Sequence, residues 1–297
     1  MEQRSDNRKS VIMMVSSMLI FGTIGVFRRH IAFSSAFLAF ARGMLGGLFL
    51  LAFTGLKKKD GGQRTPFSHL AVFAFAGVLM GINWILLFEA YTHTTVATAT
   101  LCYYMEPTIV ILLSPLIFKE RLTGKKMLCA AAAIAGMVLV SGVIGESGGQ
   151  SRNMQGIALG LMAAVFYAAV VIMNKMIRKA DAFQRTRIQL LSAGIVMIPY
   201  LILTNGFVQK SVDRTSLLLL FIVGIVHTGI AYALYFGSVD GMKVQSIAIL
   251  SYIDPVSALF FSALLLREPL SLQGIAGAVM IIGSAMISEI DFSGRPA

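Results

Sequence analysis

The feature that most constrains this chain is an internal repeat. Residues 101–122 read LCYYMEPTIVILLSPLIFKERL, and residues 249–270 read ILSYIDPVSALFFSALLLREPL. Identical or similar residues recur at a constant offset of 148 positions: Tyr104 and Tyr252, Glu106 and Asp254, Pro107 and Pro255, Ser114 and Ser262, and Lys119 and Arg267. Because one register holds over roughly fifty residues without a gap, the sequence predicts a duplicated architecture.

The amino-acid composition is typical of a membrane protein. Hydrophobic residues make up 57% of the chain and charged residues 13%, with a mean hydropathy of +0.79. Soluble domains carry about 25% charged residues, so we expect this chain to lie in a lipid bilayer. The net charge of +11 could indicate nucleic-acid binding. In a membrane protein, however, basic residues set the orientation of the chain, so no nucleic-acid partner is predicted.

Ten apolar segments are close to the ~20 residues that are needed to cross a bilayer. They lie at 11–28, 34–55, 68–90, 94–118, 124–144, 156–174, 186–204, 215–238, 243–266 and 271–290. We therefore predict an all-α integral membrane protein with ten transmembrane helices. Its expected parts are a tail (1–10), a five-helix repeat (11–144), a polar linker (145–155), a second five-helix repeat (156–290) and a tail (291–297).

The distribution of basic residues predicts the orientation of these helices. If the N-terminus is cytoplasmic, 18 of the 25 lysines and arginines lie in cytoplasmic segments and six lie in segments on the other side. This bias places both termini in the cytoplasm and the protein in the cell membrane. Five helices per repeat is an odd number, so the two halves are predicted to be inverted. Inverted repeats are typical of secondary transporters, which bind substrate near the midplane.

Two acidic residues, each followed by proline, lie near the middle of predicted spans. Pro107 and Pro255 lack the N–H of a helical hydrogen bond, so they predict helix kinks that either serve packing or line a cavity. Glu106 and Asp254 must face the protein interior, because a carboxylate is costly in lipid. They are candidates for proton coupling, for binding a substrate amine, or for a structural hydrogen bond.

Arg42 is the one basic residue deep within a predicted span. Its planar guanidinium suits a substrate carboxylate, but it could equally pair with Glu106 and hold the helices together. Tyr103 lies three residues before Glu106 and is predicted to share its helix face. The remaining candidate site residues are polar or aromatic side chains within the spans: Asn83, Trp84, His227, Tyr232 and Tyr252. A lone histidine such as His227 is more often a packing residue than a proton carrier.

Motifs of soluble enzymes are absent from the sequence. It contains no Walker loop, HExxH, paired CxxC or GxSxG motif, so no ATP-driven pumping, catalytic residue, cofactor or metal is predicted. The two cysteines, Cys102 and Cys129, lie in apolar runs and are expected to be packing residues. A membrane-embedded enzyme and a membrane scaffold remain alternatives from other functional classes.

In its spans, its repeat and its motifs, the chain resembles the EamA-type branch of the drug/metabolite transporter superfamily. The resemblance covers residues 11–290 and rests on the ten spans, the two halves and the proline-centred fourth and ninth spans. Those spans end in Lys119-Glu120-Arg121-Leu122 and in Arg267-Glu268-Pro269-Leu270. The resemblance implies a secondary carrier, most often an exporter of amino acids and other small metabolites.

The predicted function is thus secondary active transport by alternating access around a central cavity. The favoured substrate is a small zwitterion or carboxylate-bearing metabolite that Arg42 binds. The alternative is a proton-coupled exporter of organic cations or drugs, which Glu106 and Asp254 bind while Arg42 is structural. The expected partners are a small-molecule substrate and protons as a candidate coupling ion, and the assembly is a monomer or a homodimer.

Overall fold

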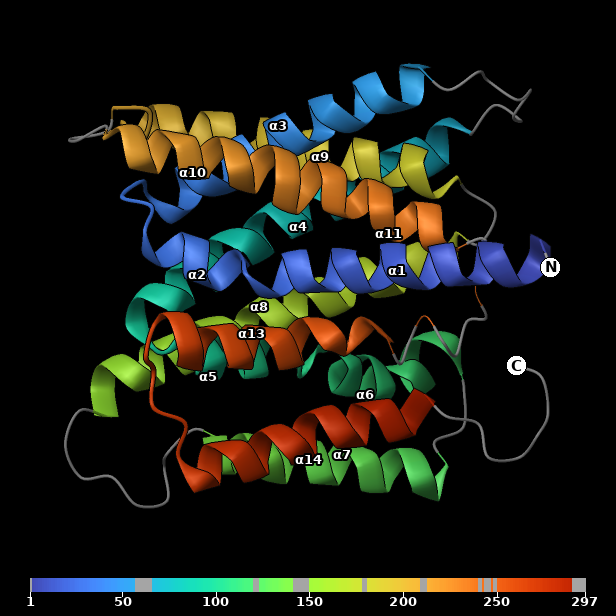
Figure 1. Cartoon of the computed structure of the whole chain (residues 1–297), viewed down its shortest axis with the longest axis vertical. Coiled ribbons are helices and arrows are strands. Elements are labelled where there is room, and N and C mark those ends of the chain that lie inside the picture. The colour runs from blue at the N-terminus through green and yellow to red at the C-terminus, as the bar shows by residue number, and fades with distance from the viewer. Residues whose placement is uncertain are drawn as a thin grey trace.

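The computed structural model describes residues 2–56, 66–119, 123–140, 150–177, 181–208, 213–239, 242, 247 and 250–289. This part of the chain is helical and contains no strand (Figure 1). The helices are α1 (Glu2–Gly22), α2 (Ile24–Arg29), α3 (Ser35–Leu56), α4 (Phe67–His93), α5 (Val96–Tyr103), α6 (Glu106–Phe118), α7 (Gly124–Val140), α8 (Gln150–Met176), α9 (Ala182–Leu203), α10 (Arg214–Gly224), the π-helix η1 (Ile225–Ile230), α11 (Ala231–Val239), α13 (Ile253–Leu265) and α14 (Leu272–Glu289).

Seven stretches of described helix are long and apolar enough to cross a membrane, so the chain is a multi-pass membrane protein. These stretches are Arg8–Arg29, Ser35–Gly55, Phe67–His93, Val96–Phe118, Asn153–Met176, Ala182–Leu203 and Arg214–Ser238. The other three predicted spans coincide with the shorter helices α7, α13 and α14. The number ten therefore stays a prediction. The basic segment 57–64 and residues 145–149 of the linker, on which the predicted orientation depends, lie outside the described residues.

The first, fourth and eighth predicted spans are interrupted rather than continuous. α1 and α2 are separated at Thr23, α5 and α6 at Tyr104 and Met105, and η1 lies between α10 and α11. The break in the fourth span lies immediately before Pro107, because α5 ends at Tyr103 and α6 restarts at Glu106. Proline is well tolerated in the first turn of a helix, where its missing N–H has no partner to lose. Pro255 likewise lies in the first turn of α13.

The internal repeat is visible in the positions and contacts of the helices. α7 begins at Gly124 and α14 begins 148 residues later, at Leu272. Two helices that are in contact in one place have repeat equivalents that are in contact elsewhere in the protein. Thus α4 packs on α8 as α11 packs on α1, and α6 packs on α8 as α13 packs on α1. The residues that follow α6 and α13 by one or two positions, Lys119 and Arg267, both have left-handed backbone conformations, with φ of 56° and 55°.

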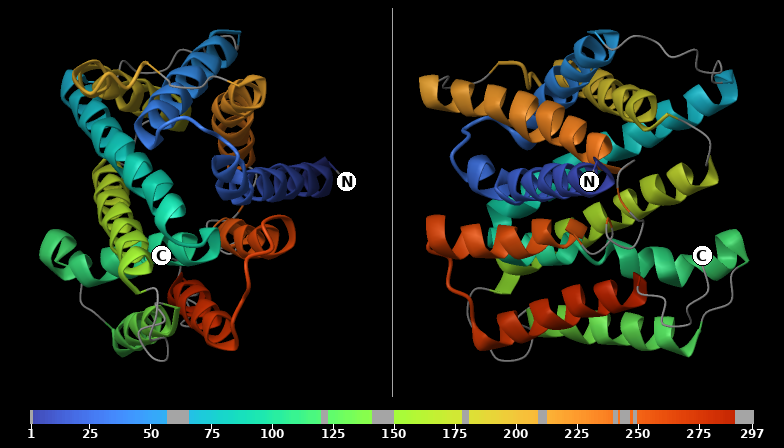
Figure 2. Two further views of the ribbon diagram at one scale, coloured as in Figure 1. Left: turned by 90° about the vertical axis from the view of Figure 1, so that its left-hand side faces the viewer. Right: turned by 45° about the vertical axis from the view of Figure 1, so that its right-hand side comes forward.

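α7 and α14 lie side by side at one edge of the molecule (Figures 1 and 2). Their backbones approach each other at two glycines. A Cβ atom at Gly136 would lie 2.8 Å from the carbonyl oxygen of Gly277, and one at Gly277 would lie 2.5 Å from that of Gly136. α3 and α9 are in similar contact at Gly43 and Gly194. Small residues allow such close approach, which is a common means of packing helices in membranes.

Candidate functional site

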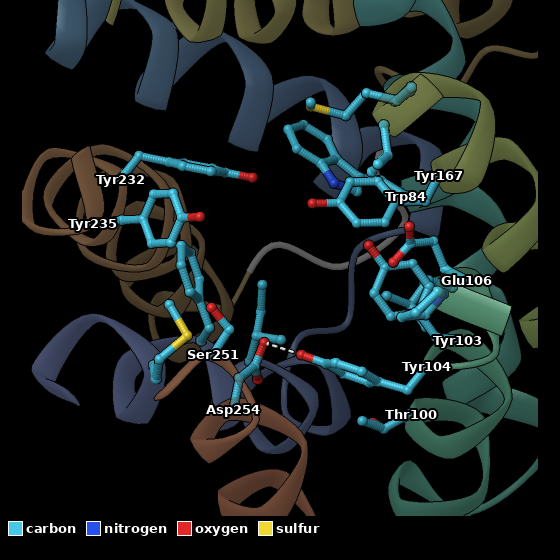
Figure 3. Close-up of a pocket in the computed structure, with 18 of the residues that line it drawn as sticks. Trp84, Thr100, Tyr103, Tyr104, Glu106, Tyr167, Tyr232, Tyr235, Ser251 and Asp254 are labelled. Atoms are coloured by element: carbon cyan, nitrogen blue, oxygen red, sulfur yellow. Dashed lines mark hydrogen bonds between the residues drawn. The ribbon is translucent and has the colours of Figure 1, made fainter. Parts of the chain in front are cut away.

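A cavity of about 600 Å³ lies between the two halves of the chain. Residues of α1 to α6 line it from the first half, and residues of α8, α9, α11 and α13 line it from the second half. α7 and α14 contribute none of its described lining residues. Figure 3 shows the two sides: Tyr232, Tyr235, Ser251 and Asp254 project from one, and Trp84, Tyr103, Tyr104, Glu106 and Tyr167 from the other. The volume is within the range of small-molecule binding sites.

The cavity wall is unusually rich in aromatic residues that carry a hydrogen-bonding group. Seven of the eight tyrosines in the chain, as well as its single tryptophan, line the cavity. The ring centroids of Tyr103 and Tyr167 are 5.3 Å apart, and those of Phe21 and Tyr232 are 5.2 Å apart. In membrane proteins such residues usually gather at the lipid headgroups. Here they supply both ring faces and hydroxyl groups to an internal space.

Arg42 of α3 is held in one orientation within this cavity. Its Nε donates to Oγ1 of Thr228 over 2.9 Å, and its guanidinium carbon lies 4.3 Å from the centroid of the Trp84 ring. Thr228 belongs to η1, where its hydroxyl also donates to the carbonyl of Val223. Within the described part of the chain, the two Nη groups of Arg42 make no hydrogen bond. A guanidinium fixed in this way is prepared to bind a carboxylate.

Asp254 lies in the first turn of α13 and is hydrogen-bonded across the cavity. The hydroxyl of Tyr104, in the break between α5 and α6, donates to Oδ2 of Asp254 over 2.6 Å (Figure 3). The bond links the two halves of the chain. Gly22 of α1 permits the close packing beside it, because a Cβ atom there would lie 2.9 Å from the carbonyl oxygen of Asp254. A carboxylate is favoured at this position by the positive end of the helix dipole.

Glu106 has the corresponding position in the first turn of α6. In Figure 3 its carboxylate lies beside Tyr103 and Tyr167, on the side of the cavity opposite Asp254. The prediction that Tyr103 and Glu106 share one helix face is corrected, because α5 ends at Tyr103 and α6 begins at Glu106. The two residues nevertheless line the same cavity.

The cavity extends toward the end of the bundle where α8 ends and α9 begins. Arg185, Gln189 and Asn174 line this part, and Nε2 of Gln189 donates to Oδ1 of Asn174 over 2.7 Å. We refer to this region as the mouth. Its polar side chains contrast with the ring faces deeper in the cavity.

The structure brings together most, but not all, of the predicted site residues. The cavity is lined by Arg42, Trp84, Tyr103, Glu106, Pro107, Tyr232, Tyr252 and Asp254. Asn83, His227 and Pro255 are not among its lining residues. Nδ2 of Asn83 donates to the carbonyl of Ala163 over 2.6 Å, which joins α4 to α8. Nε2 of His227 lies 2.8 Å from Oγ1 of Thr23, at the break between α1 and α2.

The sequence analysis missed several polar residues that line the cavity: Tyr91, Thr100, Tyr167, Arg185, Gln189, Tyr235 and Ser251. The available signal was that most tyrosines lie inside predicted spans rather than at their ends. Thr228 was also missed, and nothing in the sequence marks the π-helix that directs it toward Arg42.

The cavity lining offers several kinds of group that can bind a small molecule. Among the residues that the structure describes, no group of three or more His, Cys, Asp or Glu side chains could hold a metal ion. The cavity instead combines a fixed guanidinium, two carboxyl groups and many ring faces. These are the groups that recognise small charged molecules.

Comparison with known proteins connects this geometry with a family. The family model described as "EamA-like transporter family" matches the chain twice, at residues 8–142 and 154–289. The two matches together cover most of the chain. They correspond closely to the two halves that enclose the cavity.

Individual relatives carry related descriptions. An "Uncharacterized transporter YxxF" of Bacillus subtilis is 29% identical and covers 98% of this chain and 93% of its own length. A "Probable amino-acid metabolite efflux pump" of Salmonella typhimurium is 28% identical over 66% of this chain and 68% of its own. One crystal structure matches with a TM-score of 0.65 and 20% identity, over 94% of this chain and 96% of that one, which indicates a shared fold.

Proposed function

Because the chain belongs to the EamA-like transporter family, we propose that it is a secondary active transporter that exports small zwitterionic metabolites across the cell membrane. Amino acids and related carboxylate-bearing compounds are the favoured class. The observation that carries this proposal is the position of Arg42, fixed by Thr228 and Trp84, in one cavity with Asp254 and Glu106. A zwitterion could place its carboxylate on the guanidinium and its amine on a carboxylate.

The transport path in this proposal lies between two inverted halves of five helices each. The duplicated helix contacts support this arrangement. Two halves that are related by a pseudo-two-fold axis make each contact between them twice. Alternating access then consists of one half rocking against the other around the cavity. Cysteine labelling tests this arrangement: residues 57–64 should be cytoplasmic and residues 145–153 outside. Labelling of both segments from the same side would contradict inversion.

The orientation of the cavity fits export. Both termini are proposed to be cytoplasmic, so the mouth, where α8 ends and α9 begins, faces the cytoplasm. A substrate would enter past Arg185 and Gln189 and then reach the deeper ring faces and Arg42. The two carboxyl groups could also carry protons, which would couple export to the proton gradient.

A specific observation also favours the alternative, a proton-coupled exporter of organic cations. Two carboxyl groups and seven tyrosines line the cavity, and ring faces attract cations. Against it, Arg42 already lies over the face of Trp84 and places a positive charge in the cavity. A monovalent cation would be repelled there, whereas a zwitterion would not.

Transport assays with purified protein in proteoliposomes distinguish these functions. The panel should contain labelled amino acids, the amines made by their decarboxylation, the acids that lack the amine, and quaternary ammonium ions, with protein-free liposomes as the control. We expect exchange of zwitterions above that of the matched amines and acids. Preference for amines and quaternary ions would replace the proposal by the cation exporter. Chemical conversion of a compound would indicate an enzyme, and the absence of any uptake would contradict transport of these classes.

A further inference from the structure

Glu268 is the centre of a dense set of polar contacts at the end of the bundle opposite the mouth. It follows Arg267, whose left-handed conformation turns the chain back after α13. Oε1 of Glu268 accepts from Nη2 of Arg29 over 3.0 Å. Its Oε2 accepts from the backbone N–H of Val96 over 2.9 Å and also from the hydroxyl of Ser262.

The partners of Glu268 come from three different helices. Arg29 is the last residue of α2, Val96 is the first residue of α5, and Ser262 lies in α13. Arg29 also donates to the carbonyl of Thr94, the residue that follows α4, over 2.6 Å. The Val96 N–H is one of the unpaired donors at a helix N-terminus, where a carboxylate is favoured. A single side chain thus holds helices of both halves together.

These contacts lie just beyond the end of the cavity. The cavity is lined by Gly25, Tyr91, Thr100 and Ala258 at this end. Each lies three or four residues, or about one helical turn, from a residue that contacts Glu268 or Arg29. These lining residues therefore lie directly behind Arg29, Thr94, Val96 and Ser262. The end of α8 and the start of α9, which form the mouth, lie at the opposite end of the bundle (Figure 1).

We propose that Arg29, Thr94, Val96, Ser262 and Glu268 form a latch that closes the cavity at this end, and that the ion pair of Glu268 and Arg29 must break before the cavity can open there. The side chains of Arg29 and Glu268 are 33% and 11% exposed, so water can replace the bonds when they break. Release of Glu268 would separate α13 from α2 and α5 at once. The latch rests on the proposed access from two sides, but it requires no particular substrate.

Accessibility of a single cysteine in the cavity tests the latch without knowledge of the substrate. The background is Cys102→Ala with Cys129→Ala, which removes both cysteines of the chain, and Ser251→Cys places a thiol on the cavity wall. A membrane-impermeant sulfonated maleimide is added to vesicles of either orientation, and the rate of labelling is measured from each side. With the latch intact, we expect labelling from the mouth side to be at least about 10-fold faster than from the latch side.

Charge-neutral variants should then open the latch side. Glu268→Gln and Arg29→Gln are each expected to raise the latch-side rate about 10-fold, which corresponds to about 1.4 kcal/mol. The double variant should add little to the larger single effect, because both changes break the same ion pair. Arg29→Gln leaves the contact between Glu268 and Val96 in place, so it tests the ion pair even if Glu268→Gln fails to fold.

The matched control is Glu89→Gln. Glu89 is an acidic residue near the same end of α4 and accepts from the hydroxyl of Ser35, but it does not contact the latch. This variant should leave both labelling rates unchanged. Equal latch-side rates in the parent, Arg29→Gln and Glu268→Gln proteins would overturn the proposal, as would an equal increase in Glu89→Gln. A failure of transport with a normal labelling pattern would instead contradict the proposed function alone.

Discussion

Replacing Arg42 by lysine separates the charge of this residue from its shape. Lysine retains the positive charge in the cavity, but it loses the bond from Nε to Thr228 and the planar contact with Trp84. It also loses the fork of donors that could bind both oxygens of a carboxylate. The variant should therefore discriminate between substrates that carry a carboxylate and substrates that do not.

The expected loss follows from the number of bonds to the carboxylate. Arginine can donate two charge-assisted bonds to a carboxylate, and lysine retains one of them. The lost bond contributes about 1.5–3 kcal/mol, so the Kd for a zwitterion should increase roughly 10- to 150-fold. A ligand at about 100 times its Kd stabilises the folded protein by about 2.7 kcal/mol. At the same ligand concentration, Arg42→Lys should retain about 1.4 kcal/mol or less of that stabilisation.

Ligand-induced thermal stabilisation of the purified protein measures this difference. The ligands are amino acids and their decarboxylated amines, and the control variant is Arg214→Lys, which changes an exposed arginine at the start of α10. We expect stabilisation by the amino acids to fall in Arg42→Lys and to persist in Arg214→Lys. Stabilisation by amines alone, unchanged in Arg42→Lys, would refute the assignment of Arg42 to a carboxylate and favour the cation exporter.

Two further predictions concern coupling and packing. If Glu106 or Asp254 carries the coupling proton, Glu106→Gln or Asp254→Asn should reduce accumulation driven by a pH gradient by about 10-fold or more, while exchange without a gradient persists. Full gradient-driven accumulation in both variants would exclude these residues as proton carriers. Gly277→Ala should lower the free energy of unfolding by about 1–3 kcal/mol, because its Cβ atom would meet a backbone carbonyl of α7. Gly283→Ala is the control, since a Cβ atom there has no neighbour within 4 Å, and equal Tm values for the two variants would contradict the packing argument.

Electrostatics made three charged residues of the site predictable from the sequence, although Arg185 was missed. Arg42, Glu106 and Asp254 lie within apolar spans, and charges in lipid are costly, so each had to face the protein interior. The structure places all three on one cavity. The internal repeat also predicted that Glu106 and Asp254 have equivalent positions. Both residues do lie in the first turn of a helix.

The positions of neutral polar residues were less predictable, because such a residue can form a hydrogen bond with another helix instead of facing the cavity. Asn83 and His227 lie in apolar spans like the lining residues, but Asn83 bonds to the carbonyl of Ala163 and His227 contacts Thr23. A sequence does not distinguish a side chain that pairs with a distant helix from one that faces a cavity. The pairing of Arg29 with Glu268 spans 239 positions and was not foreseen for the same reason.

The contact between Arg42 and Trp84 has a spectroscopic consequence. Trp84 is the single tryptophan of the chain, so the tryptophan emission of the purified protein comes entirely from the wall of the cavity. The indole is 4% exposed and lies 4.3 Å below a guanidinium, and both conditions influence its emission wavelength and intensity. A molecule that binds Arg42 or displaces water from this space changes the surroundings of that one fluorophore. The protein thus contains an optical reporter of its own cavity, which requires no added label.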